Sequence, residues 1–142
     1  MDTHLEQRTH EKIVAALCGH PVELRAGRAR VVLDTSAEMA ADTRGLVHGG
    51  FTFGLADYAA MLAVNEPTVV LASAEVKFLG PAVAGDRLEA DAAVQRTDGR
   101  KRWIKVTVRR DGVAVMEGEF LAVVPDRHVL DARKDAGGAS GT

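Results

Sequence analysis

The stretch GLVHGGFTFGLADYAAMLAVN, residues 45–65, decides how this chain folds. Between Phe51 and Asn65 it is small, apolar or uncharged at every position except Asp57, and it holds four alanines and few β-branched residues. A helix that is apolar on all sides is buried on all sides, and the Pro67 that follows ends it. We therefore expect a buried helix over 51–65 with one carboxylate in its middle.

The composition around this helix is that of one globular domain. The chain has 142 residues, 46% of them apolar, and a formal net charge of −2, which offers no basic face for nucleic acid. No segment reaches the roughly 18 apolar residues of a membrane span, and the first twelve residues are too polar for a signal peptide. Cys18 is the one cysteine, so no intrachain disulfide can form. We expect a cytoplasmic protein with no nucleic-acid or membrane partner.

Strand-like runs flank the helix on both sides. Residues 3–18 predict a short amphipathic helix, 22–33 a strand and 34–45 a polar loop. After the buried helix, four runs separated by turns that contain glycine predict strands in a meander. These runs are 68–79, 86–97, 101–110 and 113–124. In the third, Ile104, Val106 and Val108 alternate with polar residues, which is typical of a strand with one buried face.

This order of elements predicts an α+β fold, in which an antiparallel sheet wraps one long central helix. We expect an N-terminal helical segment over 1–20, a single domain over 21–126 and a flexible tail over 127–142. The tail is rich in glycine, alanine and charged residues and cannot bury itself.

Common cofactor motifs are missing from the sequence. The glycines of GFTFG are not followed by Lys-Ser or Lys-Thr, which excludes a P-loop. The five histidines are scattered without the spacing of metal ligands. We therefore expect no metal and no other cofactor.

The Gly49-Gly50 pair and Asp57 are the features that can carry chemistry. The first turn of a helix has N–H groups without acceptors, which suit the oxyanion that forms during acyl transfer, and glycines let a ligand approach closely. Burial raises the pKa of a carboxyl, which suits a general base or a nucleophile. A structural interpretation fits as well: Asp57 can pair with an arginine, and the glycines can simply form a tight helix entry.

The spacing of these groups bears on oligomeric state. Gly49 and Asp57 are eight residues apart, about 12 Å along a helix, so they cannot reach the same carbonyl carbon. Two copies of the helix, antiparallel about a two-fold axis, would bring the glycine end of one to the aspartate of the other. If the two groups act together, the sequence predicts a homodimer with composite sites.

The segments RGLVHGGFTFGLADYAAMLAVN and VKFLGPAVAGDRLEADAAV resemble the hotdog-fold thioesterases of the phenylacetate-pathway (PaaI-like) type. The resemblance covers about residues 22–124. It implies the hotdog fold, in which a five- to six-stranded antiparallel sheet wraps a long helix. It also implies dimers that usually pair into homotetramers, and hydrolysis of acyl-coenzyme A thioesters, with coenzyme A entering only as part of the substrate.

Residues of the family's site carry over by position. Asp57 matches the catalytic carboxylate, as base or nucleophile, and Gly49 matches the glycine whose N–H polarises the thioester carbonyl. His48 matches a histidine that assists at the thioester or shapes the loop. Asp42 stands where many members have an asparagine that helps to hold water, which would add a second carboxylate. Where some members have a hydroxyl residue this chain has Leu71, and Ser73 is the nearest hydroxyl.

The remaining candidates are assigned more loosely, and each has a plain structural role as an alternative. Gly50 is a candidate for contact with the substrate, and Tyr58, Met61 and Phe51 are candidates for lining the acyl pocket. The basic hairpin over 96–102 offers Arg100, Lys101 and Arg102 to the phosphates of coenzyme A.

Two other functions remain open on the same fold. A hotdog hydratase or dehydratase would place an aspartate five residues before its histidine, whereas Asp42 and His48 are six apart and glycines follow. A non-catalytic acyl-CoA-binding protein would usually lose the helix acid, and this chain keeps Asp57. The predicted function is therefore hydrolysis of an aryl or a short to medium acyl thioester.

Overall fold

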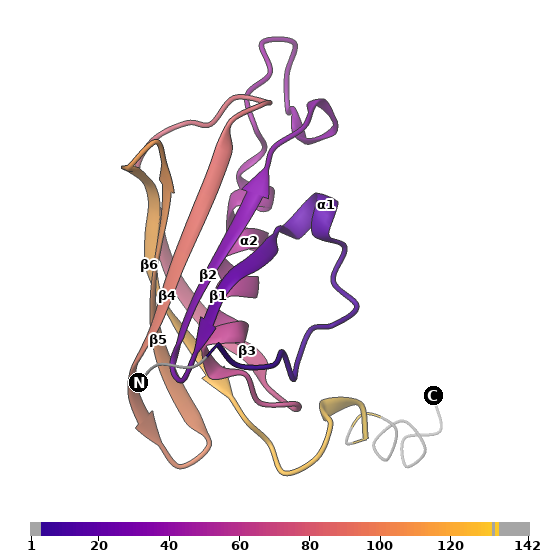
Figure 1. Ribbon diagram of the computed structural model, residues 1–142, viewed down its shortest axis with the longest axis vertical. Coiled ribbons are helices and arrows are strands. Elements are labelled where there is room, and N and C mark those ends of the chain that lie inside the picture. Colours follow the sequence, from indigo (N-terminus) through magenta and orange to yellow (C-terminus); the bar gives the residue numbers. More distant parts are fainter. Residues whose placement is uncertain (1–3, 132, 134–142) are drawn as a thin grey trace.

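In the computed structural model of the protein, one six-stranded antiparallel sheet curves around the long helix α2 (Gly49–Val64), as Figure 1 shows. The structure describes residues 4–131 and 133. This arrangement confirms the predicted α+β hotdog fold. The other elements are α1 (Ala15–Cys18), β1 (His20–Arg25), β2 (Arg28–Asp34), the short 3₁₀ helix η1 (Ala37–Met39), β3 (Val70–Phe78), β4 (Arg87–Asp98), β5 (Lys101–Arg110) and β6 (Val113–Val123).

The helix α2 is buried as its composition predicts. Leu55, Met61 and Leu62 are 0% exposed, and α2 packs against β2, β4 and β5. The helix begins two residues earlier than predicted, at Gly49. It ends at Asn65, which takes a left-handed conformation (φ 52°, ψ 40°) and donates its N–H to the Met61 carbonyl oxygen at 2.8 Å. Asparagine tolerates this conformation better than most residues, so the helix has a defined stop.

The sheet has the strand order β1-β2-β4-β5-β6-β3. Ile104, Val106 and Val108 of β5 are 0% exposed, which confirms the alternation seen in the sequence. The turns from β4 to β5 and from β5 to β6 contain Gly99 and Gly112, both at positive φ. These three strands form a meander, as predicted for the last three of the four strands after the helix.

The position of β3 differs from the prediction. It does not pair with β4 but lies at the far edge of the sheet, antiparallel to β6. β2 takes the place beside β4 and pairs its buried Val31 and Leu33 with Ala90 and Leu88. No residue of β3 is fully buried, so β3 contributes less to the core and occupies an edge.

The single strand predicted over 22–33 is a hairpin. Its two strands, β1 and β2, are joined at Ala26-Gly27, where Gly27 has φ 74°. Glycine adopts this conformation without the steric penalty of a side chain, and the chain reverses direction there. The sheet therefore has six strands, at the upper limit of the expected number.

The amphipathic helix predicted over 3–18 is wrong except for the four residues of α1. Residues 4–14 instead form an irregular segment, here called the N-terminal strap, that lies along β1 and the end of α2. The Leu5 N–H donates to the Leu24 carbonyl oxygen at 2.8 Å, and the Arg8 N–H donates to Asn65 Oδ1 at 2.8 Å. A short isolated helix is weakly stable, and these tertiary hydrogen bonds replace it.

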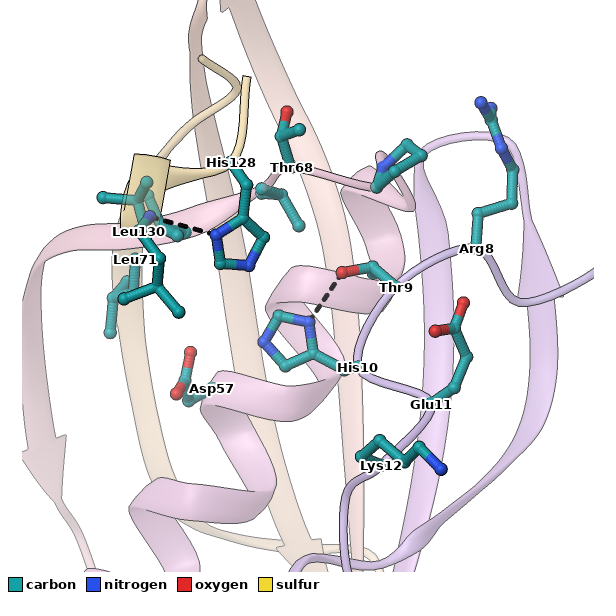
Figure 2. Close-up of a pocket in the computed structure, with 14 residues that line it drawn as sticks. Arg8, Thr9, His10, Glu11, Lys12, Asp57, Thr68, Leu71, His128 and Leu130 are labelled. Carbon is teal, nitrogen blue, oxygen red and sulfur yellow. Dashed lines mark hydrogen bonds between the residues drawn. The ribbon is translucent and has the colours of Figure 1, made fainter. Parts of the chain in front are cut away.

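Most of the predicted flexible tail, 127–142, lies outside the described residues. In the described part, the Leu130 N–H donates to His128 Nδ1 at 3.0 Å and the Asp131 N–H donates to the His128 carbonyl oxygen at 3.0 Å. These bonds hold His128 to Asp131 in one turn beside the start of β3, as Figure 2 shows.

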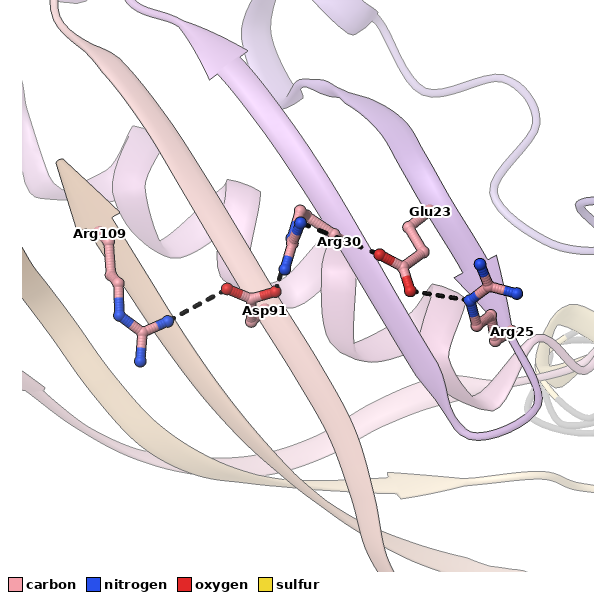
Figure 3. A network of polar contacts seen from close by, with 5 residues as sticks. All are labelled: Glu23, Arg25, Arg30, Asp91 and Arg109. Carbon is pink, nitrogen blue, oxygen red and sulfur yellow. Dashed lines mark hydrogen bonds and ion pairs between the residues drawn. The ribbon is translucent and has the colours of Figure 1, made fainter. Parts of the chain in front are cut away.

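A chain of charged side chains crosses four strands on the face of the sheet turned away from α2 (Figure 3). Asp91 accepts from Arg30 Nε at 2.9 Å and from Arg109 Nη1 at 3.1 Å. Glu23 accepts from Arg25 Nε at 2.8 Å and lies 3.9 Å from Arg30 Nη1. These pairs are partly exposed, so water and salt weaken each of them, and they add side-chain links between strands that the backbone ladders already hold together.

Candidate active site

Asp57 lies on the one side of α2 that the sheet does not cover. Gly50, Phe53, Gly54 and Asp57 are all incompletely buried, and their spacing of three and four residues places them on one face of the helix. A Cβ added at Gly54 would meet no atom within 4 Å. The aspartate therefore faces away from the core, which answers why a charged residue is tolerated in this helix.

The carboxyl of Asp57 is poorly solvated and unpaired. Its Oδ1 is buried without a hydrogen-bond partner among the described residues. Burial raises the pKa of Asp57 from 3.8 to about 6. Burial and the nearby Asp57 together raise the pKa of the Cys18 thiol. A carboxylate with a pKa near 6 is mostly ionised at neutral pH yet basic enough to accept a proton, which suits a general base.

A cavity of about 610 Å³ opens in front of Asp57. Three segments that are distant in sequence form its walls, and Figure 2 shows their side chains around the carboxylate. The N-terminal strap supplies Thr9 and His10, the start of β3 supplies Leu71, and the C-terminal turn supplies His128 and Leu130. The cavity has both polar and apolar walls, as expected for a small-molecule site.

The other predicted catalytic residues, His48 and Gly49, lie at the N-terminus of α2 together with Gly50. His48 is the N-cap residue, with φ −62° and ψ 130°, and its side chain makes no capping hydrogen bond. Gly49 and Gly50 are the first two residues of the helix, so their N–H groups have no intrahelical acceptor. The His48 ring leans over Gly50, because a Cβ there would meet its Nε2 at 2.8 Å. Phe78 covers Gly49 in the same way, at 3.3 Å.

Asp57 and the residues at this N-terminus are not brought together within one protomer. None of His48, Gly49 and Gly50 lines the cavity in front of Asp57, and the helix separates Gly49 from Asp57 by about 12 Å. The predicted site residues therefore lie at two places on the same exposed face of α2.

Asp42 also lies apart from Asp57. Its Oδ1 accepts hydrogen bonds from the N–H groups of Arg44 and Leu46, at 3.0 and 3.1 Å. Such bonds are typical of an aspartate that shapes a turn. Within the protomer this carboxylate organises the loop that leads into α2, and it does not line the cavity.

The residues predicted to contact the substrate lie outside the cavity in front of Asp57. Met61 is 0% exposed in the core, and Tyr58 is buried, with its hydroxyl accepting a hydrogen bond from Gln7 Nε2 at 3.0 Å. Ser73 is exposed on β3. Leu71, at the position where the resemblance would place a hydroxyl, does line the cavity.

The basic hairpin lies at the same end of the sheet as the cavity. Lys101 pairs with Val123, and Val123 pairs with Val70 of the cavity wall, so two strand spacings, about 10 Å, separate Lys101 from that wall. Arg100 forms an ion pair with Asp126. Arg102 Nη1 donates to two carbonyl oxygens of its own turn, at 2.8 and 3.1 Å. Lys101 is exposed and has no ion-pair partner among the described residues.

Sequence analysis missed the residues that the N-terminal strap brings to the cavity. Thr9 is buried and His10 faces Asp57 (Figure 2). No local pattern marks them, because only the tertiary hydrogen bonds of the strap place them there. The one signal in the sequence is the histidine itself, and its spacing from the other histidines is not that of a metal site.

Metal and membrane features are not found in the part of the chain that the structure describes. Among residues 4–131 and 133, no three His, Cys, Asp or Glu side chains lie close enough to hold a metal ion. No helix within those residues has the length and apolar character needed to cross a bilayer.

Comparison with known proteins defines the family. Residues 44–117, which include α2 with Gly49 and Asp57, match the model of the thioesterase superfamily. The chain therefore belongs to the thioesterase superfamily. The structure of an uncharacterised protein, PH1136 of Pyrococcus horikoshii, is 52% identical, with a TM-score of 0.90 over 91% of this chain and 99% of that one. A mutant of the phenylacetic acid degradation protein PaaI of Thermus thermophilus is 31% identical, with a TM-score of 0.72 over 78% and 96%.

Curated relatives carry different names. A methylthioribose-1-phosphate isomerase of Aquifex aeolicus is 48% identical over 119 residues, 84% of this chain but 26% of that protein. The transcription factor FapR of Caldanaerobacter subterraneus is 25% identical over 122 residues, 85% of this chain and 61% of that protein. The chain thus spans between a quarter and two thirds of these relatives, and their whole-protein activities do not transfer to it.

Proposed function

We propose that the protein hydrolyses acyl-CoA thioesters, with an aryl or a short to medium acyl group, to the free acid and coenzyme A. The observation that carries the proposal is Asp57, an unpaired and partly desolvated carboxylate at the wall of a cavity of about 610 Å³. Membership of the thioesterase superfamily supports the reaction class.

In this mechanism the carboxylate of Asp57 activates a water molecule, or attacks the thioester carbonyl itself to form a mixed anhydride that water then hydrolyses to the free acid and the restored carboxylate. Attack places negative charge on the carbonyl oxygen, and the free N–H of Gly49 is suited to stabilise it. Collapse of the tetrahedral intermediate releases the coenzyme A thiolate. Because Asp57 acts in its ionised form, we expect kcat/KM to rise as pH increases through about 6.

We propose that two protomers share each site. The outer edge of β3 is unpaired among the described residues, whereas the N-terminal strap bonds to β1 at the opposite edge. Unpaired strand edges recruit another strand, and Phe78 at the end of β3 is 55% exposed. Antiparallel pairing of β3 with β3 of a second copy would set the exposed faces of the two α2 helices against each other. Asp57 of one protomer would then face Gly49 of the other.

Thiol release from a panel of acyl-CoA and aryl-CoA esters tests the proposal. We expect one ester class to be hydrolysed, and we expect Asp57→Asn to lose at least about a hundredfold in rate while remaining folded and oligomeric. Sedimentation of the same samples gives the oligomeric state, for which a dimer, or the tetramer that the resemblance implies, is expected. Hydrolysis at an unchanged rate by Asp57→Asn would contradict the assigned role.

Non-catalytic binding of acyl-CoA is the second function to test. It is favoured by FapR, a relative that is named a transcription factor. Isothermal titration with a non-hydrolysable acyl-CoA analogue separates the two proposals. Tight binding by a wild-type protein that cleaves none of the esters would support the binding function instead.

A further inference from the structure

The N-terminal strap holds His10 in an unusual backbone conformation at the cavity. His10 has φ 58°, and among the described residues only two other non-glycine residues, Asn65 and Asp111, have positive φ. Non-glycine residues rarely adopt this region unless the surrounding structure holds them there. Such residues cluster at functional sites, and at His10 the contacts of the N-terminal strap hold this conformation in place.

Those contacts come from α2 itself. Asn65, buried at the end of α2, accepts from the Arg8 N–H at 2.8 Å and donates its Nδ2 to the Glu6 carbonyl oxygen at 2.9 Å. Gln7 Nε2 donates to the Tyr58 hydroxyl at 3.0 Å. Three hydrogen bonds thereby join the strap to α2, one at Tyr58 beside Asp57 and two at Asn65, about two turns further along the helix. The strap is fixed to the element that carries the carboxylate.

The imidazole of His10 is fixed as firmly as its backbone. It stacks on Tyr58, with ring centres 6.3 Å apart, and its Nδ1 lies 2.8 Å from Thr9 Oγ1. The Thr9 hydroxyl has no other hydrogen-bond partner among the described residues; when it donates to Nδ1, the ring carries its proton on Nε2, which is the tautomer that the inference below requires. Figure 2 shows that this second nitrogen lies on the side of the ring that faces Asp57. Burial lowers the pKa of His10, which keeps the ring neutral at neutral pH.

Other polar groups around the cavity are engaged or lie at its rim. Arg8 pairs with Glu66 at 3.7 Å, and His128 accepts the Leu130 N–H through its Nδ1. Glu11 and Lys12 are exposed. The second ring nitrogen of His128 has no hydrogen-bond partner among the described residues, but His128 is exposed at the rim, whereas His10 and Asp57 are partly buried and face each other in the inner part of the cavity.

No direct hydrogen bond joins His10 to Asp57, although Asp57 Oδ1 is buried and unpaired. A polar cavity between two such groups is suited to a water molecule that bridges them. We propose that His10 Nε2 and the Asp57 carboxylate hold the hydrolytic water between them, so that the N-terminal strap supplies a water-binding residue to the site. This inference rests on the proposed thioesterase function.

The arrangement gives the water one hydrogen-bond donor and one acceptor, and leaves a lone pair for attack on the thioester carbon. The Nε2–H of His10 donates to the water oxygen, and one water O–H donates to Asp57. In the attack the water oxygen forms a bond to the thioester carbon, and its proton passes to Asp57. The C–S bond then breaks, the thiolate of coenzyme A leaves, and the proton on Asp57 passes to that thiolate, which restores the carboxylate. His10 orients the water throughout and keeps its own proton.

Two substitutions at position 10 separate this role from a purely structural one. Asparagine fits a positive φ better than glutamine does, so a structural role predicts that His10→Asn is the milder change. Glutamine extends its amide N–H towards the place of Nε2, whereas asparagine is too short. A water-binding role therefore predicts the opposite order of activity.

The test compares kcat and KM of wild type, His10→Asn, His10→Gln and Asp57→Asn on the hydrolysed ester. His4→Asn, a change at an exposed strap residue outside the cavity, is the matched control. We expect His10→Asn to lower kcat by about ten- to a hundredfold with KM changed less than about twofold, because only the orientation of the water is lost. We expect His10→Gln to retain more activity than His10→Asn, and His4→Asn to match wild type.

Contrary outcomes are distinguishable. Full activity of His10→Asn beside an inactive Asp57→Asn would overturn the role of His10 and leave the thioesterase proposal intact. Activity of His10→Asn above that of His10→Gln would likewise overturn it. A wild-type protein that hydrolyses no ester would overturn both. Nitrogen-15 NMR of the wild-type histidines adds a readout that needs no activity: His10 is expected as the Nε2–H tautomer, and the Nδ1–H tautomer would contradict the proposal.

Discussion

Asp57 is expected to lower the stability of the fold at neutral pH. Its pKa rises from 3.8 to about 6 on folding, so the folded state disfavours the ionised carboxylate. The shift corresponds to about 3 kcal/mol at most, and to about 2 kcal/mol once partial exposure is allowed for. The cost is absent below the unfolded pKa, grows as pH rises between the two pKa values, and is complete above about 6.

Asp57→Asn removes this cost with almost no change in shape. We therefore expect the variant to be more stable than wild type by about 2 kcal/mol at pH 8 and equally stable near pH 4. Urea denaturation at both pH values, at one protein concentration, measures the difference. Equal stability at pH 8, or a variant less stable than wild type, would refute the claim that Asp57 is held unpaired and desolvated. A stability cost at Asp57 agrees with its proposed catalytic role, because residues placed for activity often lower the stability of the fold.

Other predictions concern the strap and the sheet. Asn65→Gly keeps the left-handed helix end but removes both hydrogen bonds from Asn65 to the strap, so we expect faster proteolysis within residues 4–14 and a lower kcat. Asn65→Ala should lower the free energy of unfolding, measured with urea, by about 1 kcal/mol more than Asn65→Gly does, because alanine disfavours positive φ. Gly118→Ala would place a Cβ 2.4 Å from the Glu75 carbonyl oxygen, and a loss of about 1–3 kcal/mol in urea denaturation is expected. Gly80→Ala, with 3.9 Å to its nearest neighbour, is the control and should change stability by less than about 0.5 kcal/mol. Proteolysis of Asn65→Gly at the wild-type rate would contradict the role of the Asn65 hydrogen bonds. A wild-type free energy of unfolding for Gly118→Ala would contradict the close contact at Gly118.

The fold could be predicted wherever the residues of one helix or strand show a hydrophobic pattern of their own. The all-apolar composition of α2 predicted its burial, and the alternation of Ile104, Val106 and Val108 predicted the inner face of β5. The place of β3 could not be predicted, because strand order depends on which apolar faces pair across the sheet. β2 pairs with β4 through its buried Val31 and Leu33, and no local sequence pattern shows that β2 rather than β3 takes this position.

The site could be predicted only in part, for a similar reason. Asp57 stood out because a lone acid in an apolar helix contradicts its surroundings. His10 did not stand out, because its place at the cavity depends on Asn65 and Tyr58, more than 45 residues away along the chain. Asp42 attracted attention as a second carboxylate, yet in the protomer it shapes the turn that leads into α2.

Gly49 offers a clean way to remove the proposed oxyanion donor. It is the first residue of α2, a position where proline is tolerated, and His48 already has the extended conformation that a following proline requires. Gly49→Pro therefore deletes the N–H with little effect on the helix, whereas Gly49→Ala keeps the N–H and only presses on Phe78. We expect Gly49→Pro to be about a hundredfold less active and Gly49→Ala to be far less affected.

Complementation between Asp57→Asn and Gly49→Pro subunits tests the central claim of a shared site most directly. Each variant alone is expected to be nearly inactive. In a mixed dimer, one site would combine the intact Asp57 of one subunit with the intact Gly49 of the other, so random co-assembly should restore about a quarter of wild-type activity. Activity that stays at the level of the separate variants, in samples shown to contain mixed dimers, would contradict the shared site.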